Sequence, residues 1–135
     1  MKSPPKDATL QAIVKMRADA FITQWFGNDW YRRGDPKPML EVSLEDLIIF
    51  VQQHGIPNSV LVENSWSGHE NFVIQHEGSL WRLGYAERGN ASLISTHNSI
   101  TEARSAVTRE LWSLYETAAN PSYWKDGVAN GTPMV

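Results

Sequence analysis

Residues 71–89 read Asn-Phe-Val-Ile-Gln-His-Glu-Gly-Ser-Leu-Trp-Arg-Leu-Gly-Tyr-Ala-Glu-Arg-Gly. Two apolar runs flank Glu77-Gly78, which predicts a hairpin with these two residues as its loop. With that loop, the paired positions are His76 and Ser79, Ile74 and Trp81, and Phe72 and Leu83. Since side chains alternate along a strand, one face of the hairpin carries Phe72, Ile74, Trp81, Leu83 and Tyr85. The other face is mixed in polarity, so the stretch predicts a sheet with one face covered by helices.

Size and composition are those of a small globular protein. A chain of 135 residues with 41% apolar and 20% charged residues is long and apolar enough to bury one core, which predicts a single domain over residues 1–135. The sequence has no apolar run of the roughly 18 residues that a membrane span needs, and its start lacks the apolar stretch of a signal peptide. The absence of cysteine excludes disulfides and thiol chemistry. We therefore expect a cytoplasmic protein without a membrane partner.

The net charge of −3 is distributed unevenly along the chain. Residues 38–79 contain no lysine or arginine. Their acidic residues are Glu41, Glu45, Asp46, Glu63, Glu70 and Glu77. Because phosphate binding rests on lysine and arginine, this segment is unsuited to nucleic acid and better suited to a basic protein partner. The alternative is an acidic surface that only meets water.

Two helices are expected before the sheet. The spacing of apolar residues over 7–26 predicts one helix that ends at Gly27. Residues 28–42 contain the breakers Gly34-Asp35-Pro36 and predict a long loop. A second helix begins at Ser43, whose side chain can cap it, and ends at Gly55. Its expected buried stripe is Leu44, Leu47, Ile48 and Val51.

The rest of the chain predicts strands and one more helix. Strands are expected at 59–64, in the hairpin and at 92–96, with a polar loop over 64–69. Ser99 and Glu102 form a capping-box pattern, which predicts a helix from there to about residue 117. Its expected inward residues are Ile100, Ala103, Ala106, Val107, Leu111, Leu114 and Tyr115. We expect the tail, residues 120–135, to be loosely ordered.

The predicted fold class is therefore α+β. A small antiparallel sheet of three to four strands has one face covered by three helices, in the order α-α-β-β-β-β-α.

No arrangement of residues in the sequence predicts catalysis. The histidines, His54, His69, His76 and His97, include no pair at metal-ligand spacing on a predicted helix. There is no glycine-rich phosphate loop and no nucleophile-elbow motif. We expect no metal, no cofactor and no enzyme activity.

The tripeptide Glu87-Arg88-Gly89 is the most informative short motif. Alternation places Glu87 on the covered face at the end of its strand, where it needs a donor such as Arg104. Arg88 points the other way, and Gly89 permits a turn with positive φ.

A strand reading Leu-Trp-Arg-Leu-Gly-Tyr-Ala-Glu-Arg-Gly over 80–89, then a short strand, then a helix beginning Ser-x-x-Glu-Ala, resembles small bacterial immunity proteins. These are the antidotes of polymorphic toxin and contact-dependent growth inhibition systems. The resemblance covers residues 71–115. It implies a non-catalytic protein that binds and neutralises a cognate toxin domain, often a basic nuclease, which the acidic segment would suit.

Exposed aromatic residues are the expected anchors for such a partner. Trp66 is the first candidate, since it lies in a polar loop, and Trp30 is the second. We favour a monomer. The alternative is a dimeric type III secretion chaperone, which is also small, acidic and α+β but binds an unfolded effector segment.

Overall fold

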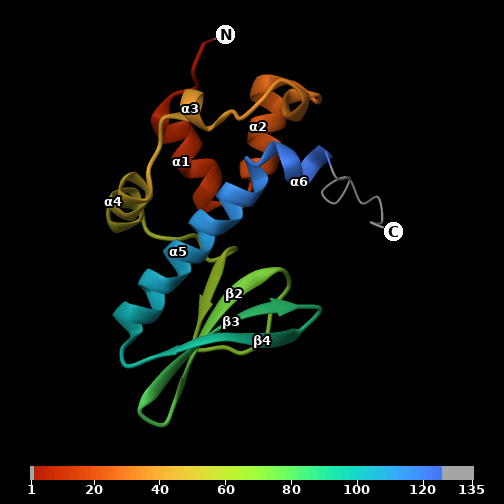
Figure 1. Ribbon diagram of the computed structural model, residues 1–135. Coiled ribbons are helices and arrows are strands. Elements are labelled where there is room, and N and C mark those ends of the chain that lie inside the picture. The colour runs from red at the N-terminus through yellow and green to blue at the C-terminus, as the bar shows by residue number, and fades with distance from the viewer. Residues whose placement is uncertain (1, 126–135) are drawn as a thin grey trace. The chain divides into compact units, whose positions relative to one another are not determined.

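The structure is a computed structural model that describes residues 2–125 (Figure 1). Its helices are α1 (Lys6–Val14), α2 (Ala18–Phe26), the 3₁₀ helix η1 (Trp30–Arg32), α3 (Lys37–Leu40), α4 (Leu44–His54), α5 (Ile100–Ala118) and α6 (Pro121–Lys125). Its strands are β1 (Leu61–Glu63), β2 (Asn71–Glu77), β3 (Leu80–Glu87) and β4 (Asn90–His97). The fold is α+β, and the predicted order of helices, four strands and a further helix is confirmed.

The chain divides into two compact units. The first consists of the residues up to Leu47 and from Leu111 onward, and the second consists of Ile48–Glu110. The chain passes between the units within α4 and within α5. The expectation of one domain stays a prediction. No helix among residues 2–125 is both long and apolar enough to span a membrane.

The helix predicted over 7–26 is two helices, because the chain turns at Met16. Met16 has φ 57°, in the left-handed region. The Met16 N–H donates to the Ile13 carbonyl at 3.1 Å, and the Arg17 N–H donates to the Ala12 carbonyl at 2.8 Å. This is a Schellman motif, which ends a helix and is usually built on glycine. A methionine there gives no turn signal in the sequence, so the break was missed.

The predicted loop over 28–42 contains two short helices, η1 and α3. Trp30 of η1 is only 2% exposed and packs edge-to-face against Tyr31 and Trp124 at centroid distances of 5.9 and 5.8 Å. Its interpretation as an exposed anchor is therefore wrong, because the ring belongs to the core of its unit. Trp124 lies in α6, so residues 121–125 of the predicted tail are helical. The remainder, 126–135, lies outside the described residues.

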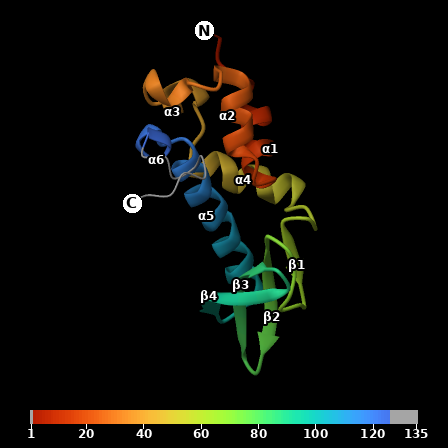
Figure 2. The same ribbon diagram turned by 90° about the vertical axis from the view of Figure 1, so that its right-hand side faces the viewer.

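The four strands form one sheet in the order β1-β2-β3-β4 (Figure 2). β1 is parallel to β2, whereas the other neighbours are antiparallel, so the sheet is mixed and not antiparallel throughout. The hairpin loop is Gly78-Ser79, one residue later than predicted, and the pairs are Phe72–Tyr85, Ile74–Leu83 and His76–Trp81. Gly78 has φ 62°, as the first position of a type II′ turn requires. The observed partner of each β2 residue lies two positions further along β3 than the predicted partner. Because side chains alternate with a period of two, the predicted faces are confirmed although the predicted pairs are wrong.

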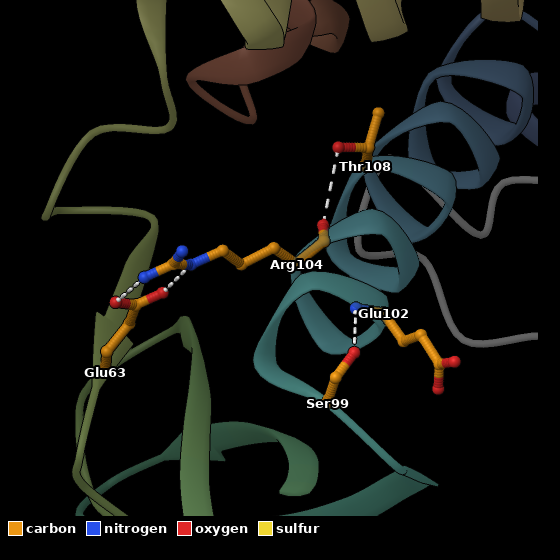
Figure 3. Close-up of polar contacts among 5 residues, drawn as sticks. All are labelled: Glu63, Ser99, Glu102, Arg104 and Thr108. Atoms are coloured by element: carbon orange, nitrogen blue, oxygen red, sulfur yellow. Dashed lines mark hydrogen bonds and ion pairs between the residues drawn. The ribbon is translucent and has the colours of Figure 1, made fainter.

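We name the two faces of the sheet by what covers them. The inner face carries Leu61, Glu63, Phe72, Ile74, Leu83 and Tyr85, which are neighbours in the strand register. Arg104 of α5 binds Glu63, so the first half of α5 lies on this face (Figure 3). The outer face carries Val62, Val73, Arg82, Gly84, Ala86 and Leu93. Val73 and Ala86 are 0% exposed, so the outer face is also partly covered, which the sequence did not predict.

Both predicted helix starts are confirmed. The Asp46 N–H donates to Ser43 Oγ at 3.1 Å, and the Ser43 N–H donates to Asp46 Oδ2 at 3.0 Å. The Glu102 N–H donates to Ser99 Oγ at 3.1 Å (Figure 3). The first cap is reciprocal, whereas at the second the Glu102 carboxylate accepts from the Asn98 N–H at 3.1 Å. Both caps satisfy amides that have no partner inside the helix.

The predicted buried stripes of these helices are only partly right. In α4 only Leu47 is buried, while Leu44, Ile48 and Val51 are half-buried. In α5 the buried residues are Ala103, Val107, Thr108, Leu111 and Tyr115, and Ala119 directly after the helix is also buried. Leu114 is 46% exposed and was wrongly placed inside.

Candidate protein-binding surface

Trp66 lies on the outer face of the sheet, directly over Gly84. A Cβ atom added to Gly84 would lie 2.7 Å from Trp66 Cη2, closer than van der Waals contact permits. The glycine in the middle of β3 therefore provides the space into which the indole ring fits. Trp66 is half-buried, so part of the ring is open to a partner.

Arg82 holds this ring from the same face. Its guanidinium carbon lies 4.0 Å from the centroid of the Trp66 ring, a cation–π contact. Arg82 Nη2 donates to Gln75 Oε1 at 2.5 Å. Arg82 Nε lies 2.6 Å from Glu77 Oε2, and these two atoms form an ion pair whose angle is not that of a hydrogen bond. Gln75 and Glu77 thus fix the guanidinium against the ring.

The loop that carries Trp66 is tied down at its far end. The His69 N–H donates to Asn71 Oδ1 at 2.7 Å, and the buried Asn71 side chain donates to the Phe72 carbonyl at 3.0 Å. The Gly89 N–H donates to the Gly68 carbonyl at 2.9 Å, which joins this loop to the β3–β4 turn. The orientation of Trp66 is therefore preorganised by hydrogen bonds and not left to a mobile loop.

The motif Glu87-Arg88-Gly89 forms that turn. Arg88 and Gly89 have φ 52° and 88°, which are the values of a two-residue type I′ hairpin loop. The positive φ of Gly89 is confirmed. Glu87 is exposed at the end of β3 and needs no donor from the protein, and Arg104, expected as its partner, binds Glu63.

Exposed apolar side chains surround Trp66 on the sheet. Leu93 pairs with Gly84 in the register and is 57% exposed. Leu80 of β3 is 41% exposed, and Ile94 is 39% exposed at the bulge where the β3–β4 register shifts. A bulge twists an edge strand away from further strand pairing, so this surface presents side chains more than a backbone edge. We call Trp66, Leu80, Arg82 and Leu93 the outer-face patch.

The six predicted acidic residues do not form one free surface. Three are paired within the chain: Asp46 lies 3.5 Å from Lys6, Glu63 binds Arg104, and Glu77 binds Arg82. The expectation that the whole segment is free for a partner is wrong to that extent, because Lys6, Arg82 and Arg104, which lie outside the segment, pair with half of its acids. Hydrogen bonding from the Ser43 N–H holds the pKa of Asp46 below its ordinary value.

The other three predicted acids, Glu41, Glu45 and Glu70, have no ion pair within 4.0 Å among residues 2–125. Glu41 ends α3 with a φ of 55°, so it also has a structural role. Glu41 and Glu45 belong to the first unit and Glu70 to the second.

Glu70 and Glu87 both lie near Tyr85 at one end of the sheet. Partial burial raises the pKa of Tyr85, and the charges of Glu70 and Glu87 raise it further. Neither carboxylate has a cationic partner within 4.0 Å among the described residues. This end of the second unit therefore carries two carboxylates without an ion-pair partner, with one exposed arginine, Arg88, in the adjoining turn.

Sequence reasoning named Trp66 and the acids as candidates, which stays a prediction, and did not name Arg82, Gly84 or Leu93. Gly84 is the signal that was available, because a glycine inside a strand often marks a close approach by another group. The residues described here include no group of three or more His, Asp or Glu side chains placed to hold a metal ion. No protein-family model, no curated protein and no solved structure matches this chain.

Proposed function

We propose that this protein is a non-catalytic, protein-binding inhibitor: an immunity protein that binds and neutralises a cognate toxin domain. The observation that carries the proposal is the outer-face patch, in which a half-buried Trp66 is held by Arg82 beside the exposed Leu93. Tryptophan and arginine are the residue types most enriched among residues that dominate binding energy. A preorganised ring with exposed apolar neighbours is what a partner protein needs as an anchor.

The charge of the partner follows from the acids that stay unpaired. Glu70 and Glu87 in the second unit would attract a basic toxin domain, such as a nuclease, and speed its association. Glu41 and Glu45 would add to the same long-range attraction, since they too are unpaired among the described residues. The resemblance of residues 71–115 to immunity proteins supports the same class of function.

The first test pairs this protein with the C-terminal domain of the protein encoded in the adjoining reading frame, which we expect to be the toxin. Co-expression should restore the growth of bacteria that carry the toxin domain, and the two proteins should co-purify. We expect Trp66→Ala to weaken binding by about 2 kcal/mol, or about 30-fold. Leu93→Ser, which changes an exposed side chain, should weaken binding without loss of folding.

The matched control is Leu114→Ser, since Leu114 is 46% exposed but lies on α5 in the other unit. It should bind as the wild type does. If Trp66→Ala and Leu93→Ser also bind and protect like the wild type, the outer-face patch is not the toxin-binding surface.

Electrostatic attraction has its own measurement. Glu70→Lys and Glu87→Lys should slow association, and raising the salt concentration should slow association of the wild type in the same way. Glu116→Lys, an exposed substitution in the other unit, is the comparison. An association rate that does not change with salt would remove the electrostatic part of the proposal.

A dimeric type III secretion chaperone is the alternative function. In that case the exposed Leu80, Leu93 and Ile94 would lie between two copies of the chain. Sedimentation equilibrium distinguishes the two: a stable dimer that Leu93→Ser dissociates favours the chaperone, and a monomer favours the immunity protein.

A further inference from the structure

A groove lies in the second unit at the β1 edge of the sheet, the edge opposite β4 in the strand order. It has a volume of about 700 Å³ and is lined by α4, the segment after it, all three residues of β1 and Arg104. A second hollow of about 280 Å³ continues from it, since Val51 and Arg104 line both. The combined volume lies within the roughly 300–1,000 Å³ of ligand-binding clefts.

Part of the backbone of β1 is unpaired along this groove, since the Leu61 N–H already donates to the Pro57 carbonyl at 3.0 Å. β1 is an edge strand, and its pairing with β2 uses the Val60 carbonyl, which accepts from Phe72 at 2.7 Å, and the Asn64 N–H, which donates to Ile74 at 2.7 Å. In a parallel ladder alternate residues bond to opposite sides. The Glu63 N–H and carbonyl therefore point away from β2, toward the open edge.

Apolar side chains line the large compartment. Val51, Ile56, Leu61 and Val62 border it, and Val51 and Ile56 are half-buried instead of fully packed. Ile48 and Val51 of the predicted apolar stripe of α4 border the two compartments, and both are only half-buried. An edge strand with unpaired backbone groups beside an apolar groove is the geometry in which extended peptides add to a sheet.

Cationic and hydroxyl side chains line the small compartment. Arg104 stands at the junction, where it donates to Glu63 at 2.5 and 2.7 Å (Figure 3). Arg109 lies beyond it together with Thr101 and Ser105, and has no carboxylate within 4.0 Å among residues 2–125. The walls of the two compartments thus hold two arginines against one glutamate, a net positive charge.

We propose that this groove binds an extended peptide segment of a partner protein, which adds as a strand beside β1 and places a carboxylate on Arg109. Backbone hydrogen bonds to the Glu63 N–H and carbonyl would align the segment. Its alternate side chains would enter the apolar compartment, and its C-terminal or side-chain carboxylate would reach the small one. The occupant is acidic where it ends, so it differs in charge from the basic toxin partner of the outer face.

The probe is the peptide acetyl-Thr-Val-Thr-Val-Thr-Val with a free C-terminal carboxylate, compared with the same peptide as its amide. Titration into isotopically labelled protein should shift the amide resonances of residues 51–63 and 101–109 and should slow hydrogen exchange at the Glu63 amide. A charge-assisted hydrogen bond predicts about tenfold tighter binding of the carboxylate form. Methylating alternate peptide nitrogens should abolish binding, because it removes the donors of a paired strand.

Arg109→Gln should remove the preference for the carboxylate form while leaving binding of the amide form unchanged. Arg88→Gln is the matched control, since Arg88 is an exposed arginine of the same unit in the β3–β4 turn. Equal affinity for acid and amide would overturn the carboxylate site. Undiminished binding of the methylated peptide, no saturable shift at millimolar peptide, or the same shifts with acetate alone would overturn strand addition.

Discussion

Replacing Gly84 with alanine places a methyl group under the Trp66 ring. The added Cβ would lie 2.7 Å from Trp66 Cη2 and 2.8 Å from the Ser92 carbonyl oxygen. Ordinary contacts need more than 3.4 Å, so both neighbours must move. The ring can tilt only by loosening its contact with Arg82, and the Ser92 oxygen belongs to the backbone of β4.

The expected cost follows from these two contacts. Overpacking of this kind costs about 1–3 kcal/mol, and we expect about 2 kcal/mol for Gly84→Ala. About half of that comes from the Trp66 contact, because a partly desolvated cation–π pair contributes about 1 kcal/mol. In a Trp66→Ala background the cost of Gly84→Ala should therefore fall to about 1 kcal/mol. The coupling energy, which is the difference between the two costs, is then about 1 kcal/mol and lies above the usual additivity error of about 0.5 kcal/mol.

Urea unfolding of the wild type, both single variants and the double variant measures this coupling. Circular dichroism should follow the transition, because removal of one tryptophan changes the fluorescence. Alanine is a better strand residue than glycine, so without either close contact the substitution would be close to neutral or stabilising. An unchanged stability, or the same cost with and without Trp66, would refute the seating of the ring on Gly84 and with it the outer-face patch.

Three further predictions concern the turns and the ion pair. Arg88→Asn should raise the free energy of unfolding by about 1 kcal/mol in urea, because asparagine tolerates the positive φ of a type I′ turn better than arginine does. Glu41→Gly should stabilise by about 0.5–1 kcal/mol by relieving the left-handed backbone at the end of α3, whereas Glu41→Ala, which removes the same charge, should not. Hydrogen bonds from Arg104 lower the pKa of Glu63 from its ordinary value of 4.5, so the pair stabilises the fold above that pH and the contribution is lost as pH falls through the folded pKa. Wild type and Glu63→Gln should differ in stability by at most about 1 kcal/mol, because the pair is partly exposed. Urea unfolding at decreasing pH should show this difference disappear. A difference that persists at low pH would exclude the ion pair as its source.

Local signals in the chain were enough for several elements. The Ser43 and Ser99 caps, the turn at Gly89, the α+β class and the two faces of the hairpin each depend on residues close in sequence. The faces were right even though the loop was misplaced by one residue. Moving a hairpin loop by one residue shifts each partner by two positions, and side chains alternate with a period of two.

The breaks and the surfaces depended on contacts that no local pattern encodes. Met16 turns the first helix without a glycine, and Trp30 is buried because Trp124 of a distant helix packs on it. Lys6 and Arg104 pair with Asp46 and Glu63, two acids of the segment 38–79 that itself contains no lysine or arginine.

The sequence by itself determined the types and approximate order of the elements, because hydrophobic period and capping act over a few residues. Only the tertiary structure decided which charges stay free and which aromatic ring meets solvent. Those outcomes are set by side chains tens of residues apart, as with Arg104 and Glu63, whose pairing over 41 positions leaves no mark on either local pattern.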